Sequence, residues 1–84
     1  MRVLLVEDDP TLRNVMCQKL TDTGNRVDMA GDLATATHLW AVQTFDVILL
    51  DLNLPESPLA SSPMASGLSL LKQIRAKGDR TPVL

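Results

Sequence analysis

The chain has 84 residues, of which 45% are hydrophobic and 21% are charged. This balance excludes a disordered chain and a coiled coil and indicates at most one small globular domain. The formal net charge is −2 and no basic stripe is present, so nucleic-acid binding by this stretch itself is disfavoured. The apolar runs are far shorter than the roughly 20 residues of a transmembrane helix, and we expect no membrane contact. The single cysteine, Cys17, cannot form an internal disulfide, which fits a cytoplasmic location.

The first part of the chain predicts a buried strand followed by a helix. Residues 3–6 form a continuous apolar run, which is typical of a strand buried on both faces. Asp9 is suited to cap a helix that has Pro10 at its first position, and Gly24 is suited to a left-handed helix end. The spacing therefore predicts an amphipathic helix over 10–23, with an apolar stripe of Leu12, Val15, Met16 and Leu20.

The same unit is repeated in the middle of the chain. Residues 26–30 alternate in polarity and predict a second strand. Asp32 is a plausible cap for a second helix, which we expect to end near Thr44. Residues 47–50 repeat the apolar pattern of the first strand, and this third strand ends at Asp51.

The last third of the chain begins with a segment of different composition. Residues 55–66 hold three of the five prolines and four of the five serines, which predicts a loop. A third amphipathic helix should begin at Gly67 and end near Gly78, and residues 81–84 look like the start of a fourth strand. The alternation of strands and helices predicts an α/β fold with a parallel sheet and right-handed crossovers.

Acidic residues follow the ends of two predicted strands: Glu7 and Asp8 follow the first, and Asp51 ends the third. In an open α/β sheet, ligands bind outside the carboxyl ends of the strands. Neighbouring strands lie about 4.8 Å apart, so these carboxylates would converge if strands one and three are neighbours. Clustered carboxylates need a compensating proton or cation, and hard oxygen ligands suit Mg²⁺. Solvated acids or helix caps are the alternative, which we favour for Asp9.

Two segments resemble a known family. Residues 3–9 (VLLVEDD) and 46–55 (DVILLDLNLP) closely resemble the two leading motifs of the two-component response-regulator receiver domain, in particular of the OmpR/PhoB type. The spacing between the motifs fits, as do residues 67–71 and 81–83, so the resemblance covers essentially the whole chain. It implies a doubly wound, flavodoxin-like receiver fold with strand order 2-1-3-4-5.

The resemblance also implies the roles of individual residues. Asp51 matches the aspartate that accepts a phosphoryl group from a sensor histidine kinase. Glu7, Asp8 and Asp51 match the acidic residues that hold Mg²⁺, with Asp8 the favoured direct ligand of the pair. Asn53 matches the position whose backbone carbonyl completes the protein ligands. The resemblance implies that the domain is a signalling phosphoacceptor and not an enzyme, because such domains catalyse only the phosphorylation of their own aspartate.

The chain departs from the family pattern in two places. Family members have a Ser or Thr after strand four and a Lys after strand five, and neither position exists within residues 1–84. We therefore expect three βα units and the start of strand four, the N-terminal two-thirds of a receiver domain. The rest of a longer protein would supply homodimerisation and DNA binding through an effector domain. By itself, the chain should not be a stable monomeric receiver, because its third strand lies close to an open edge.

The second departure is the segment Glu56–Ser66, which replaces a much shorter loop of the family. We expect this insert to be mobile and to lie beside the acidic pocket.

Two other functions are compatible with parts of the pattern. A haloacid-dehalogenase-type phosphohydrolase also uses an aspartate at a strand end, but it requires a second Asp two residues later, where this chain has Asn53. A pseudo-receiver that binds partners without phosphorylation is disfavoured for the parent protein by the intact acids, but the lack of the later Ser or Thr and Lys favours it for these 84 residues. His38 is predicted to be a surface residue, whereas Trp40 and Phe45 are predicted to pack in the core.

Overall fold

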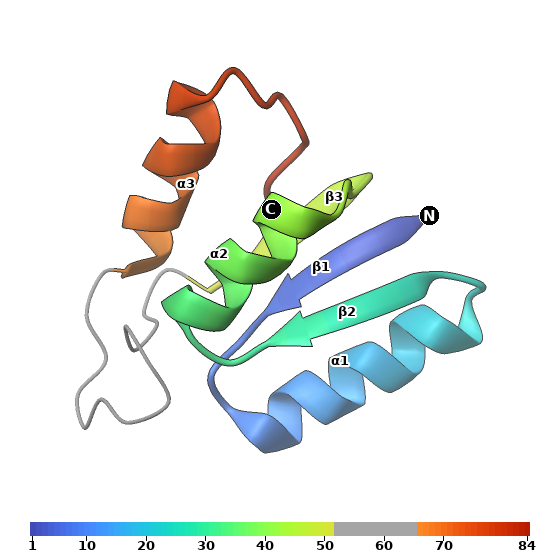
Figure 1. The fold of residues 1–84 in the computed structure, drawn as a ribbon. Helices are drawn as coiled ribbons and strands as arrows, with labels where there is room; N and C mark the ends of the chain where they lie inside the picture. Colours follow the sequence, from blue (N-terminus) through green and yellow to red (C-terminus); the bar gives the residue numbers. More distant parts are fainter. Residues whose placement is uncertain (52–65) are drawn as a thin grey trace.

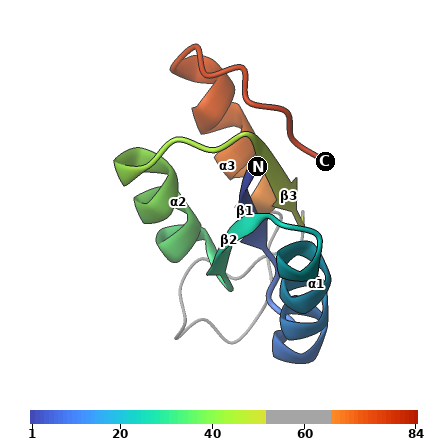
Figure 2. The ribbon, with the colours of Figure 1, turned by 90° about the vertical axis from the view of Figure 1, so that its right-hand side faces the viewer.

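The computed structural model describes residues 1–51 and 66–84, with the side chains of the last helix from residue 68 onward, and arranges them in three layers (Figure 1). The middle layer is a parallel sheet of order β2-β1-β3. Its strands are β1 (Arg2–Val6), β2 (Arg26–Ala30) and β3 (Val47–Leu50). Figure 2 shows helix α1 (Pro10–Asp22) on one face of the sheet and helices α2 (Leu33–Val42) and α3 (Ser66–Ala76) on the other. The predicted α/β alternation and the pairing of β1 with β3 are both confirmed.

The ends of the helices form where the sequence predicts them. The carboxylate of Asp9 accepts hydrogen bonds from the backbone N–H groups of Thr11 and Leu12, at 2.9 and 3.2 Å. Asp32 caps α2 in the same way, with its Oδ1 2.7 Å from the backbone nitrogen of Thr35. These bonds satisfy N–H groups that have no partner inside the helix. Gly24 follows α1 with φ of +89°, a left-handed conformation that glycine adopts without a steric penalty.

Among the elements that the structure describes, strand β1 is the most deeply buried. Its residues Val3, Leu4, Leu5 and Val6 are each at most 1% exposed. The strand has neighbours on both edges and helices on both faces, which explains why its sequence is apolar without alternation. The core on the α2 and α3 face is formed by Leu4, Val6, Ala30, Ala36, Phe45, Ile48, Leu70 and Ile74.

Residues 82–84 lie along the free edge of β3. Val83 forms a parallel bridge with Ile48. The backbone nitrogen of Ile48 donates to the carbonyl of Pro82 at 2.9 Å, and the nitrogen of Leu84 donates to the carbonyl of Ile48 at 2.8 Å. The predicted start of a fourth strand is therefore confirmed, next to β3.

The burial of α1 differs from what an amphipathic helix suggests. Its apolar stripe exists, but α1 contains no buried residue, and Leu12 and Val15 are 44% and 48% exposed. A groove of about 440 Å³ separates the stripe from β3, and its walls include Leu49 and Leu84. No other element within residues 1–51 and 66–84 covers this groove, so the stripe stays partly in solvent.

Two predictions fall on residues that the structure does not describe. Asn53 lies outside the described residues, and so does the insert Glu56–Ser66 apart from the backbone of Ser66, which begins α3. Among the helices that the structure does describe, none is long and apolar enough to cross a bilayer.

Candidate functional site

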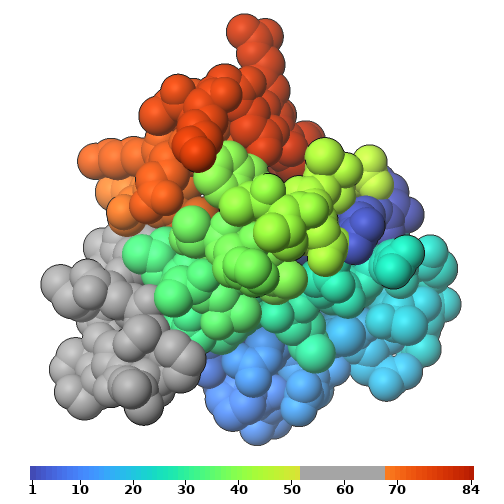
Figure 3. Space-filling view, in the orientation of Figure 1, coloured from blue at the N-terminus to red at the C-terminus, as the bar shows by residue number. Residues whose placement is uncertain are grey.

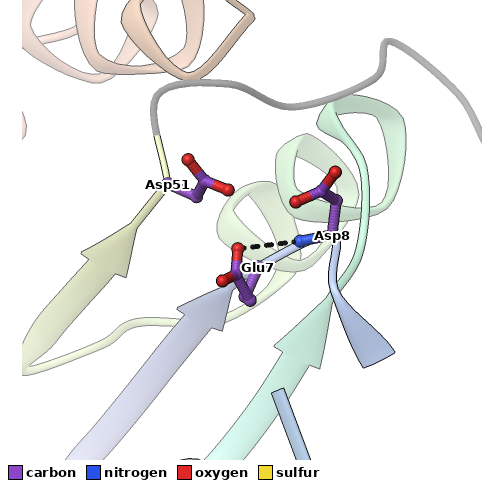
Figure 4. A group of neighbouring side chains, drawn as sticks. All are labelled: Glu7, Asp8 and Asp51. Atoms are coloured by element: carbon purple, nitrogen blue, oxygen red, sulfur yellow. Dashed lines mark hydrogen bonds between the residues drawn. The ribbon is translucent and has the colours of Figure 1, made fainter. Parts of the chain in front are cut away.

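Three carboxylates gather at the carboxyl ends of the central strand β1 and its neighbour β3 (Figure 4). Glu7 and Asp8 follow β1, and Asp51 follows β3. One oxygen of each side chain lies within 4.8 Å of one oxygen of the other two. All three residues are half-buried. The predicted convergence of these acids is thus confirmed, and it follows from the parallel pairing of β1 with β3.

The sheet fixes the backbone on which this acidic cluster stands. The nitrogen of Glu7 donates to the carbonyl of Ala30, and the nitrogen of Asp51 donates to the carbonyl of Val6, both at 2.9 Å. The side chain of Glu7 in turn accepts a hydrogen bond from the backbone N–H of Asp8, at 3.1 Å (Figure 4). Because the flanking strands are buried, the three carboxylates start from rigid positions.

The proximity of these groups changes the acidity of Glu7. Burial, a hydrogen bond with the Asp51 carboxyl and the negative charge of Asp51 together raise the pKa of Glu7 to about 7, although the N–H of Asp8 opposes the shift. A proton therefore offsets part of the repulsion within the cluster at neutral pH. A divalent cation would offset the repulsion more fully, because it compensates two charges and binds several oxygens. The donor set, which consists of carboxylate oxygens only, suits Mg²⁺.

Arg13 is a residue of this site that the sequence reasoning missed. Its Nη1 reaches back from α1 and donates to the carbonyl oxygen of Glu7, at 3.0 Å. Gly31 makes room for this side chain, since a Cβ at position 31 would lie 2.6 Å from Arg13 Nη1. The sequence feature that could have indicated this contact is the glycine directly after β2, at the same edge of the sheet as the acids.

The residues that we assigned to ordinary structural roles lie away from the cluster. His38 is an exposed residue of α2, as predicted. Phe45 is 8% exposed and belongs to the core, and Trp40 packs against the core from the rim. Cys17 is a free, half-buried thiol whose sulfur lies 3.9 Å from the hydroxyl of Thr21.

A family model described as the response regulator receiver domain matches residues 3–84. The chain belongs to this family. The virulence transcriptional regulatory protein PhoP of Salmonella typhimurium is 36% identical over 84 residues, which are 100% of this chain and 34% of PhoP. The resemblance to OmpR/PhoB-type regulators and the two-component class of the domain are thereby confirmed.

Solved receiver domains share the fold. The receiver domain of the Francisella response regulator 1452 has a TM-score of 0.82 and 30% sequence identity, over 98% of this chain and 61% of the other. The response regulator TrrA, crystallised with the histidine kinase ThkA, has a TM-score of 0.75 and 27% identity, over 98% of this chain and 64% of the other. This receiver chain thus spans about three-fifths of the solved chains and about a third of its curated relative.

Proposed function

We propose that this receiver domain accepts a phosphoryl group on Asp51 and so acts as the input switch of a two-component regulator in the cytoplasm. The observation that carries the proposal is the position of Asp51, which directly follows β3 and has a carboxylate oxygen within 4.8 Å of oxygens of Glu7 and Asp8. A carboxylate oxygen of Asp51 would attack the phosphorus atom of a kinase phosphohistidine. The new P–O bond gives an acyl phosphate, and the P–N bond breaks with its electron pair on the imidazole.

The three acids of the cluster would together bind the metal that this reaction needs. Glu7, Asp8 and Asp51 would hold Mg²⁺, with the backbone carbonyl of Asn53 as the further ligand that the family resemblance implies. When bound, Mg²⁺ spreads the charge of the phosphoryl oxygens. Glu7 must lose its proton to serve as a ligand, so its raised pKa means that Mg²⁺ competes with a proton for this carboxylate.

A sensor histidine kinase is the proposed donor. The complex of TrrA with ThkA supports this partner, because TrrA shares the fold of this chain. The relationship to PhoP supports a transcriptional output, with homodimerisation and DNA binding supplied by parts that lie outside these 84 residues.

Phosphorylation by acetyl phosphate with Mg²⁺, followed by intact mass spectrometry, tests the assignment. In the full-length protein, we expect one phosphoryl group on the wild type and none on Asp51→Asn or after addition of EDTA. Asp22→Asn is a matched control, because Asp22 is an exposed acid at the end of α1 and should leave the labelling unchanged. Equal labelling of wild type and Asp51→Asn would refute the role of Asp51.

Two further outcomes would support the alternatives. If neither acetyl phosphate nor beryllofluoride modifies the full-length wild-type protein, a pseudo-receiver that binds partners without phosphate is supported. Repeated release of phosphate from a simple phosphomonoester would instead support a phosphohydrolase.

A further inference from the structure

One side chain outside the acidic cluster holds the backbone on which Glu7 and Asp8 stand. Arg13 lies at the start of α1, where its backbone nitrogen donates to the carbonyl of Asp9 at 2.8 Å. Its side chain reaches back to the end of β1, and Nη1 donates to the carbonyl oxygen of Glu7 at 3.0 Å. Both ends of Arg13 are therefore fixed, the backbone by the capped helix and the guanidinium by the strand end.

The carbonyl that Arg13 contacts belongs to the peptide unit that joins Glu7 to Asp8. The opposite end of this unit, the N–H of Asp8, donates to Oε2 of the Glu7 carboxylate at 3.1 Å (Figure 4). A peptide unit is planar, and its plane contains the Cα atoms of both residues. One hydrogen bond at each end thus sets the direction in which the two side chains leave the backbone. Of these two bonds, only the one from Arg13 leaves the carboxylate oxygens of the cluster unused.

Gly31 borders the guanidinium of Arg13 at the end of β2. Figure 3 shows the start of α1, in blue, directly against the green surface of the chain that follows β2. A Cβ at position 31 would lie 2.6 Å from Arg13 Nη1 but 3.7 Å from the Glu7 carbonyl oxygen, which is an ordinary contact distance. Among the described residues, only Gly24 and Gly78 have a positive φ, so Gly31 does not. Glycine is therefore needed at position 31 for the space that Arg13 occupies, and not for its own conformation.

We propose that Arg13 is a positioning residue of the acidic cluster and that Gly31 keeps open the space for its guanidinium. This inference rests on the proposed function, because it assigns to Arg13 the placement of Glu7 and Asp8 for Mg²⁺. Arg13 acts through the Glu7 carbonyl and not as a metal ligand, since a guanidinium has donors only. Residues that orient metal ligands change the metal affinity when they are replaced. A bond that merely fastened α1 to the sheet would contribute to stability and leave the Mg²⁺ affinity unchanged.

Mg²⁺ titrations of the full-length, isotope-labelled protein test this role. The amide resonance of Asp8 reports on the peptide unit that Arg13 holds, and urea titrations of the same variants measure stability separately. Arg13→Ala removes the hydrogen bond to Glu7 and should weaken Mg²⁺ binding about tenfold. It should also shift the Asp8 amide resonance in the metal-free protein, because the peptide unit is released.

Arg75→Ala is the matched control. Arg75 also donates from a helix to backbone carbonyls, those of Asp79 at 2.8 Å and Thr81 at 3.0 Å. These carbonyls lie far from the acids, since the Thr81 hydroxyl contacts the carbonyl of Phe45 just before the amino end of β3. Arg75→Ala should therefore lose stability in urea but keep the Mg²⁺ affinity of the wild type.

Gly31→Ala separates the position of the guanidinium from its charge. The charge of Arg13 remains, but Nη1 must move away from the new Cβ. Because the displaced atoms are the end of a flexible side chain, stability should change little, whereas Mg²⁺ binding should weaken about threefold or more. The double variant of Gly31→Ala with Arg13→Ala should bind Mg²⁺ no more weakly than Arg13→Ala alone, because no guanidinium is left to displace.

The outcomes distinguish this inference from the function on which it rests. Equal Mg²⁺ affinity of wild type and Arg13→Ala would overturn the role of Arg13 alone, and so would equal losses of affinity in Arg13→Ala and Arg75→Ala. Additive losses in the double variant would overturn the role of Gly31. If Arg13→Ala does not fold, an unchanged affinity of Gly31→Ala overturns the inference. A wild type that binds no Mg²⁺ would instead overturn the proposed metal site, and this inference with it.

Discussion

Replacing Glu7 by glutamine should stabilise the metal-free domain, although Glu7 belongs to the proposed metal site. Glutamine has the same size and keeps an oxygen for the N–H of Asp8, but it removes one negative charge from the cluster. The chosen oxygens lie within 4.8 Å of one another. At that limit, two unit charges repel by about 0.9 kcal/mol at the dielectric constant of water and by about 3.5 kcal/mol at a value of 20. The groups are half-buried and screened by solvent, so we expect a gain near the lower value, about 1 kcal/mol.

The gain should depend on pH in a defined direction. The pKa of Glu7 rises from 4.5 to about 7 on folding, so the folded state binds this proton more tightly. The contribution of Glu7 to stability is therefore complete below pH 4.5 and is lost as the pH rises through 7. The glutamine variant has no such loss. The two proteins should be equally stable near pH 4.5, and the variant should be more stable at pH 8.

Thermal melts with and without Mg²⁺ check this reasoning. About 1 kcal/mol corresponds to a rise of about 4–8 °C in the melting temperature of a domain of this size. Mg²⁺ at tenfold its dissociation constant should stabilise the wild type by about 1.4 kcal/mol at pH 8, and the variant by clearly less. Asp22→Asn, a change of an exposed acid far from the cluster, should show neither effect. A Glu7→Gln variant that is less stable than wild type at pH 8 without metal would contradict the predicted repulsion.

Three further predictions concern the fold itself. Ile48→Ala empties a fully buried position of β3 and should lower the free energy of unfolding by about 2–5 kcal/mol in urea titrations; a loss below 1 kcal/mol would mean that the core closes over the gap. Asp9→Ala removes the cap of α1 and should cost about 1 kcal/mol in the same assay, whereas Asp9→Asn should cost little; equal losses would disprove the capping role. Trp40→Phe removes the indole donor to Asp79, whose pKa is held below its ordinary value by Thr81 first and by Trp40 next. The stability that Asp79 contributes through its lowered pKa is present above the ordinary value of 3.8 and is lost as the pH falls. The Trp40→Phe variant should therefore show a higher Asp79 pKa and a smaller loss of stability in acid. An unchanged Asp79 pKa in an NMR titration would refute the link.

The sequence predicts the parts of this fold that depend on local order. The continuous apolar run at 3–6 predicts a strand that is covered on both sides, and β1 does lie in the middle of the sheet. The run at 47–50 has the same pattern, but β3 is an outer strand of the three-stranded sheet, and only its Ile48 is fully buried. The capping roles of Asp9 and Gly24 are equally local, because each depends on the backbone of its own turn. The convergence of Glu7 with Asp51 needs one further step, the parallel pairing of their strands.

Other features depend on contacts between distant residues, and no local pattern indicates them. Arg13 reaches Glu7 only because α1 packs against the end of β1, and Gly31 leaves the necessary space. The hydrogen bond between Trp40 and Asp79 joins residues 39 positions apart. The partial exposure of Leu12 likewise depends on what covers α1, which the periodicity of a single helix does not determine.

The uneven burial of β1 and α1 implies a hierarchy of local opening. Amide protons of β1 are enclosed by two strands and two layers of helices, so they should exchange with solvent only when the whole domain unfolds. Helix α1 has no buried residue, so its amides should exchange through fraying that leaves the sheet intact. Glu7 and Asp8 continue directly from the slowest-exchanging strand. The carboxylates can therefore keep their mutual placement through many openings of the helix that follows them.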